Sequence, residues 1–228
     1  MFGSLRRLAQ TFLEKLRWLL TIETHEFYGI SLHVHTDADE SCLEKVTKAL
    51  DLIWEFDPVK YKSIFRLLPG GIAIDEPKAV SAEYLHERKM CYLNFDYVKR
   101  YHSEDISLTI VHELCHARLM SHGIGYTEGI RLRVEKACIR RELAFAIILD
   151  LHYEGEDYFV NMIKSVQENI SPENYTDAAF QMRARRNLLL RLRSLKDLGI
   201  PGILRRCAVV RHRRRRLREG WVKKSGSA

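Results

Sequence analysis

The sequence predicts an α+β protein, with a few strands and helices in its first half and an almost entirely helical second half. Short alternating apolar segments occur before residue 96, whereas helical periodicity runs from about Glu104 nearly to Leu198. The chain is 46% hydrophobic and 10% aromatic, enough to bury a sizeable core. The longest strictly apolar run, Leu143–Leu149, is too short to cross a membrane, and five scattered cysteines indicate reduced thiols and a cytoplasmic location.

The first half alternates predicted helices and strands. Residues 2–20 have the apolar spacing of an amphipathic helix, which could dock on the core, on another chain or on a membrane surface. Gly29–His35 alternates as a strand does, and Ser41–Phe56 has a helical pattern that Asp57-Pro58 ends. The side chains expected to face inward from this helix are Leu43, Val46, Leu50, Ile53 and Trp54.

Two further strands are predicted before the helical half begins. The turn Pro69-Gly70-Gly71 leads into Ile72–Asp75, and Met90–Asp96 is the third strand candidate. Ser103 is expected to cap the next helix, and Ser171-Pro172 starts another by the same logic. We expect three parts: an amphipathic segment over 1–25, the main domain over 26–200 and a basic tail over 201–228.

The formal net charge of +7 belongs to the end of the chain. Ten basic residues and one acid lie between Ile203 and Ala228, a net +9, which leaves 27 basic and 29 acidic residues in the rest. This tail could contact nucleic acid or an anionic membrane through residues 205–224, and a solvated tail is the alternative. Without a nucleic-acid fold motif, the charge does not indicate a DNA-binding protein.

The segment with the most chemical information is Thr109–Ala117, which contains His112, Glu113 and His116 in a His-Glu-x-x-His pattern. Histidines four residues apart project from one face of a helix and can share a Zn²⁺ at about 2.0–2.1 Å. Glu113 lies about 100° around the helix from His112, where its carboxylate can take a proton from a metal-activated water. The alternative is two polar histidines on a solvated helix face.

A catalytic zinc needs a third protein ligand. If Ser121–Gly125 turns the chain into a helical hairpin, the midpoint of the two histidines lies about 11 Å before the turn, and Glu135 lies level with it. Glu128 would sit near the bend, and Glu142 would be about 10 Å too far along, so the spacing favours Glu135. Weaker candidates, expected to be surface histidines, are His122, His33 and His35.

His112–His116, followed by a glutamate 19 residues later on a second helix, resembles the gluzincin metallopeptidases. The text Val111–His116 and the stretch Glu135–Ala146 are also similar to the small ImmA/IrrE-type zinc peptidases, whose third ligand is a glutamate on such a helix. The resemblance covers about residues 85–150. The second helix lacks the Asn-Glu-x-x-Ser-Asp text of larger gluzincins, which leaves the choice between Glu135 and Glu142 open.

The resemblance implies a zincin-like fold, a Zn²⁺ cofactor and the hydrolysis of a peptide or protein substrate. Its ligands would be His112, His116 and Glu135, with Glu113 as general base, and an edge strand at Cys91–Phe95 would bind the substrate backbone. The alternative is a non-enzymatic or inactive zinc-binding adaptor that attaches to an anionic surface through the basic tail.

Several residues near the motif could have secondary roles. Tyr126, Arg131 and Tyr153 are chemically able to stabilise an oxyanion, and packing or surface roles are the alternatives. Cys115 and Cys138 are expected to be buried inert thiols rather than ligands.

Overall fold

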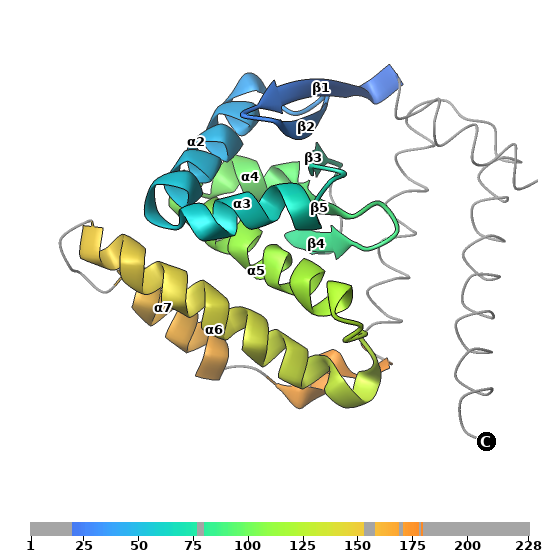
Figure 1. Cartoon of the computed structure of the whole chain (residues 1–228), viewed down its shortest axis with the longest axis vertical. Coiled ribbons are helices and arrows are strands. Elements are labelled where there is room, and N and C mark those ends of the chain that lie inside the picture. Colours follow the sequence, from blue (N-terminus) through green and yellow to red (C-terminus); the bar gives the residue numbers. More distant parts are fainter. Residues whose placement is uncertain (1–19, 77–79, 153–157, 169–170, 178, 180–228) are drawn as a thin grey trace, which may run out of the picture. The chain divides into compact units, whose positions relative to one another are not determined.

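A computed structural model describes residues 20–76, 80–152, 158–168, 171–177 and 179. Apart from Leu20, they belong to one compact unit, Thr21–Phe180. The elements of this unit, shown in Figure 1, are β1 (Ile22–Phe27), β2 (Ile30–His35), α2 (Glu40–Phe56), α3 (Pro58–Leu67), β3 (Ile72–Asp75), β4 (Ala82–Leu85), β5 (Met90–Asn94), α4 (Phe95–Arg100), α5 (Ser103–Ser121), α6 (Glu128–His152), α7 (Tyr158–Glu168) and the 3₁₀ turn η1 (Pro172–Tyr175). A sheet in the first half followed by helices confirms the coarse prediction of a mixed α and β fold.

The five strands of the described residues form one mixed sheet in the order β1-β2-β3-β5-β4. β2, β3 and β5 run parallel, while β1 and β4 are antiparallel edge strands. The expectation that Cys91–Phe95 is an edge strand is therefore wrong. β4, which the sequence did not predict, pairs Ala82 with Leu93 and Leu85 with Met90 and so covers β5.

Two tight turns fix the register of β2. Tyr28 and Gly29 both have positive φ values, 46° and 80°, as in the two-residue turns that match the twist of a hairpin. Gly71, at a φ of 76°, approaches β2 so closely that a Cβ there would lie 2.0 Å from the carbonyl oxygen of Ser31. A larger residue at position 71 would therefore push β3 away from β2.

The core lies between the sheet and the helices packed on it. Ile72 and Ile74 of β3 are fully buried, as are Leu50 and Ile53 of α2. Replacing any of these by alanine would cost about 2–5 kcal/mol of folding free energy, because a cavity adds to the lost burial. Trp54 was expected to face this core, but it is 51% exposed and packs edge-on against Tyr61 of α3.

Helix α5 is the central helix of the unit. It contacts α2, α3, β4 and β5 on one side and α6 on the other, and α7 packs against α6 (Figure 1). Its buried apolar residues Ile106, Ile110, Val111 and Leu114 anchor it in the core. The helix therefore holds its remaining face rigidly against α6.

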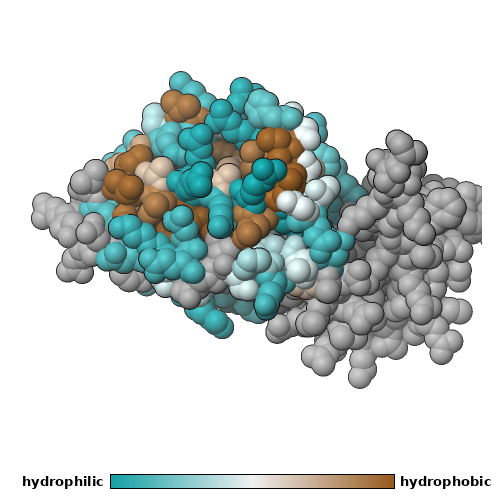
Figure 2. Space-filling model, turned by 90° about the horizontal axis from the view of Figure 1, so that it is seen from below, coloured by the Kyte–Doolittle hydropathy of each residue, from teal (hydrophilic) through white to brown (hydrophobic). Residues whose placement is uncertain are grey.

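The α6 and α7 side of Figure 1 is seen face-on in Figure 2. Hydrophobic residues gather there between hydrophilic ones, over the part that the structure describes. Across the described residues, none of the helices combines the length and the apolar character that crossing a membrane requires.

Several element boundaries differ from the sequence expectation. Asp57-Pro58 ends α2 as expected, but Asp57 also accepts a hydrogen bond from the Lys60 amide and so begins α3. The strand Met90–Asp96 stops at Asn94, whose side chain accepts from the Asp96 amide and starts α4. β1 begins at Ile22, before the expected domain boundary at residue 26. Residues 1–19, the end of the main domain and the basic tail lie outside the described residues.

Candidate metal centre

The centre lies between α5 and α6, which form the antiparallel hairpin that the sequence predicted. His116 lies opposite Glu135, whereas His112, one turn earlier on α5, reaches Glu142, two turns later on α6. The start of α5 differs in detail: Ser103 is its first residue rather than its cap, and Asp105 accepts a hydrogen bond from the His102 amide. That carboxylate lies at the positive end of the helix dipole, where negative charge is favourable.

The two motif histidines point into the space between the helices. Their ring centroids are 5.1 Å apart, and their side chains are 17% and 15% exposed. Oε2 of Glu135 lies 3.4 Å from Nε2 of His112, and Oε1 of Glu135 lies 3.5 Å from Nε2 of His116. Ligand atoms bonded tetrahedrally to zinc at about 2.0–2.1 Å lie about 3.3–3.4 Å from each other. The three side chains therefore have the separation that one such ion needs.

Glu142 and Glu128 occupy different places from Glu135. Oε2 of Glu142 accepts a hydrogen bond from Nδ1 of His112 at 2.9 Å, on the opposite side of the ring from Nε2. A carboxylate in this position fixes the histidine tautomer and leaves Nε2 for a metal. Glu128 accepts a hydrogen bond from the Asp177 amide at 2.7 Å, near the start of α6. Of the three glutamates, only Glu135 faces Nε2 of both histidines.

Burial and charge shift the proton affinities of the two histidines in opposite directions. Burial alone would lower the pKa of His112, but hydrogen bonds to Glu135 and Glu142 outweigh it and raise the pKa well above its usual value. Burial, together with the charge of His112, lowers the pKa of His116 to about 4. In the metal-free chain, His112 therefore carries a proton in the place that suits a cation.

The two carboxyl groups beside the histidines also differ. Burial opposes ionisation of Glu135, but its hydrogen bond with His112 and the nearby charge of His116 lower its pKa overall. Burial raises the pKa of Glu113 to about 7. Glu113 is hydrogen-bonded to the backbone of Tyr84 and thus lies against edge strand β4.

Cys138 belongs to this centre, contrary to its expected role as an inert thiol. Ligand atoms of His112, His116 and Cys138 all lie within 4.8 Å of one another, a group that could hold a metal ion. The Cys138 side chain is fully buried. Its hydrogen bond with Cys115 and its burial raise the pKa of Cys138, whereas the same hydrogen bond lowers that of Cys115 to about 7.

Tyr126 joins the centre from the loop before α6. Its hydroxyl donates a hydrogen bond to Oε1 of Glu135, and its ring meets His116 edge-on at 5.4 Å. Arg131, the second candidate for oxyanion stabilisation, is instead paired with Asp177 at 2.7 Å. The third, Tyr153, lies outside the described residues.

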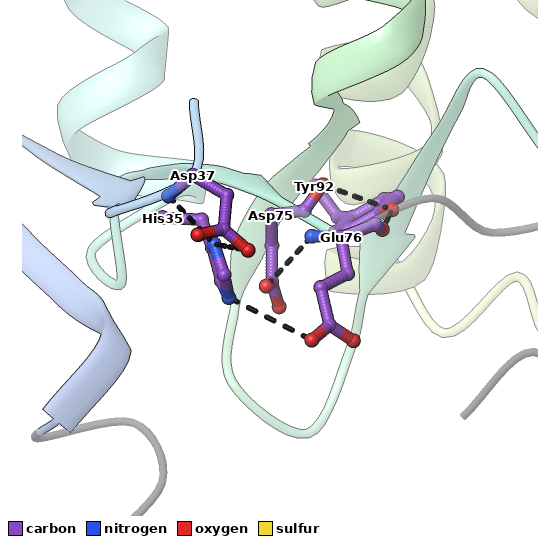
Figure 3. A network of polar contacts seen from close by, with 5 residues as sticks. All are labelled: His35, Asp37, Asp75, Glu76 and Tyr92. Carbon is purple, nitrogen blue, oxygen red and sulfur yellow. Dashed lines mark hydrogen bonds and ion pairs between the residues drawn. The ribbon is translucent and has the colours of Figure 1, made fainter. Parts of the chain in front are cut away.

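The weaker histidine candidates lie elsewhere. His122 is the C-terminal cap of α5, and His33 contacts Thr24 and the carbonyl of Gly70 within the sheet region. His35 is buried at the end of β2, where its Nδ1 accepts a hydrogen bond from the Asp37 amide at 3.1 Å (Figure 3).

The contacts of His35 argue against a second metal site. Because Nδ1 is an acceptor, the neutral ring carries its proton on Nε2, 3.7 Å from Glu76 (Figure 3). A metal needs a lone pair on that nitrogen, so this tautomer does not offer one.

Two signals in the sequence could have located the residues that were missed. Cys138 and Glu142 follow Glu135 by three and seven residues, a spacing that repeats on one face of a helix. The chain matches no protein-family model, no curated protein and no solved structure.

Proposed function

We propose that this chain is a zinc-dependent metallopeptidase that hydrolyses peptide bonds, with a peptide or protein as substrate. His112, His116 and Glu135 would hold the Zn²⁺, and Glu113 would act as general base. The observation that carries the proposal is the position of the Glu135 carboxylate, 3.4 and 3.5 Å from Nε2 of the two histidines. A two-histidine, one-carboxylate set is a donor combination typical of catalytic zinc.

The surrounding residues suit a catalytic centre. A bound Zn²⁺ would supply Lewis-acid chemistry and increase the acidity of a water molecule. Glu142 orients His112 through Nδ1, and the Tyr126 hydroxyl holds one oxygen of Glu135. These two contacts preorganise the ligands, because each side chain is fixed before a metal arrives.

Glu113 connects the metal ligands to a surface that could receive a peptide. It follows His112 on α5, is 7% exposed and is hydrogen-bonded to the Tyr84 backbone in β4. β4 is an edge strand, and an extended peptide could add to it through main-chain hydrogen bonds. Its scissile bond would then pass the Glu113 carboxylate, which can move a proton from water to the leaving amine.

Two broader features belong to the same proposal. The sheet with β4 beside α5, and the α5–α6 hairpin, support a zincin-like fold. The cysteines within the described residues, Cys42, Cys91, Cys115 and Cys138, are free thiols, which supports a cytoplasmic location.

The test compares the wild-type chain with Glu113→Gln. We expect the variant to retain about one zinc per chain by metal analysis and to lose hydrolysis of a fluorogenic peptide library, because glutamine cannot accept the proton. Glu104→Gln, on the first turn of the same helix, is the matched control and should retain both. Unchanged hydrolysis by Glu113→Gln would contradict the proposed mechanism.

A non-catalytic zinc-binding protein is the second candidate, and Cys138 favours it. A fourth protein donor within reach of the histidines could close the site, and closed four-ligand zinc sites are structural. The expected contact of residues 205–224 with nucleic acid or an anionic membrane lies outside the described residues and stays a prediction.

A further inference from the structure

The thiol of Cys138 bears on how the proposed zinc centre is regulated. Cys138 is fully buried on α6, and its sulfur belongs to the group of ligand atoms within 4.8 Å that includes both motif histidines. A buried thiol beside two imidazoles differs from the cysteines of the hydrophobic core. Cys42 of α2 and Cys91 of β5 are surrounded by apolar side chains there.

The helix geometry directs four donors toward one point. Glu135 and Cys138 are three residues apart on α6 and share a face, as His112 and His116 do at four residues apart on α5. Because the two helices are antiparallel and in contact, each pair faces the other. Two facing pairs of this kind can supply the corners of a tetrahedron.

The sulfur lies close enough to join with a small movement. With zinc–nitrogen bonds of about 2.05 Å and a zinc–sulfur bond of about 2.3 Å, a tetrahedral sulfur lies about 3.6 Å from each nitrogen. The group spans at most 4.8 Å, so side-chain rotation of about an ångström would bring the thiol into range. Coordination deprotonates a thiol, and the proton released from the Cys138 sulfur would pass to water as the sulfur–metal bond forms.

We infer that Cys138 is a fourth protein ligand of this centre and closes it in the resting, reduced protein. The inference rests on the proposed function, because it assumes that His112, His116 and Glu135 hold zinc. Catalytic zinc sites keep one position open for water, whereas sites with four protein ligands do not. Hydrolysis therefore requires the Cys138 thiolate to leave the metal, which makes this residue an internal inhibitor of the peptidase.

Cys115 is the natural control for this inference. It lies on α5 beside His116 and is hydrogen-bonded to Cys138, but the group of candidate ligand atoms does not include it. Both thiols can be replaced by alanine at the cost of only one buried sulfur atom. A difference between the two variants therefore reports on coordination and not on packing around a cysteine.

The experiment is zinc-edge X-ray absorption on the full chain, purified under reducing conditions and loaded with Zn²⁺. Wild type and Cys115→Ala should each show one sulfur at about 2.3 Å beside nitrogen or oxygen at about 2.0–2.1 Å. Cys138→Ala should retain zinc, lose the sulfur shell and hydrolyse the fluorogenic peptide library faster than wild type.

Each alternative result has a distinct meaning. A wild-type spectrum with only nitrogen and oxygen would overturn the role of Cys138 while leaving the proposed zinc centre intact. Absence of bound zinc would overturn both. If Cys138→Ala does not fold, the wild-type and Cys115→Ala spectra still decide, since a sulfur shell lost in Cys115→Ala would assign the wrong thiol.

Discussion

Glu142 offers the sharpest test of how the centre is organised, because it was the alternative third ligand. Its carboxylate accepts the Nδ1 proton of His112 at 2.9 Å, and the two side chains are only 14% and 17% exposed. If Glu142 orients His112 without binding metal, its loss weakens zinc binding but does not abolish it. Partners of this type are worth about 10–100-fold in metal affinity, which corresponds to about 1.4–2.7 kcal/mol.

Two substitutions separate orientation from charge. Glu142→Ala removes the acceptor, so we expect the full 10–100-fold loss of zinc affinity. Glu142→Gln retains an oxygen that can accept from Nδ1 but removes the charge, so its affinity should lie between that of Glu142→Ala and that of wild type. The expected order of affinity is therefore wild type, then glutamine, then alanine.

The assay is competition for zinc against a chromophoric chelator at fixed pH. Glu135→Gln is the comparison for loss of a ligand and should bind zinc more weakly than either Glu142 variant. Glu128→Gln is the matched control, because Glu128 accepts only from the Asp177 amide among the contacts described above and should bind as wild type does. A Glu142→Ala chain that loses zinc as completely as Glu135→Gln would refute the reasoning and make Glu142 a ligand.

Three other predictions concern stability and the tail. Lys45→Met should lower the free energy of unfolding in urea by about 1–3 kcal/mol relative to Lys48→Met, because Nζ of Lys45 donates to three carbonyls around the end of α4. Burial lowers the pKa of His33, so the native state binds protons less readily than the unfolded chain. Stability should therefore fall as pH drops through about 6.5, and the fall should be smaller in His33→Gln. Replacing the arginines at 213–216 by glutamine in the full chain should reduce the salt dependence of binding to single-stranded DNA by about 0.7 per lost phosphate contact, whereas an unchanged slope would remove the tail from binding.

The elements that the sequence predicted best have a strong local pattern. Ile72–Asp75 is a strand with the expected bounds, because three buried apolar residues follow a glycine turn. β1 was missed because four of its six residues are polar and it is exposed on both faces. β4 was missed because it has only four residues, and its pairing with β5 is a tertiary contact without a local signal.

The boundaries failed where one residue has two roles. Asp57 ends α2 and its side chain also caps α3, so Pro58 is both a terminator and a first helical residue. Asn94 likewise ends β5 and caps α4. A pattern that marks a break does not say that a new helix begins immediately after it.

The centre was partly predictable because its geometry follows from counting along two helices. A rise of about 1.5 Å per residue places Glu135 level with His112 and His116 without any tertiary information. Counting could not assign Glu142 or Cys138, because their roles depend on how far α6 is rotated about its axis. It also could not bring Tyr126 to Glu135, since the loop between the helices sets that contact.

The most direct test of the zinc centre is anomalous diffraction at the zinc edge from crystals of the zinc-loaded full chain. The account predicts one peak between α5 and α6, bonded at about 2.0–2.2 Å to Nε2 of His112, Nε2 of His116 and a carboxylate oxygen of Glu135, with Glu142 remaining on Nδ1 of His112. No peak at this position, or a peak bonded to Glu142 in place of Glu135, would contradict it.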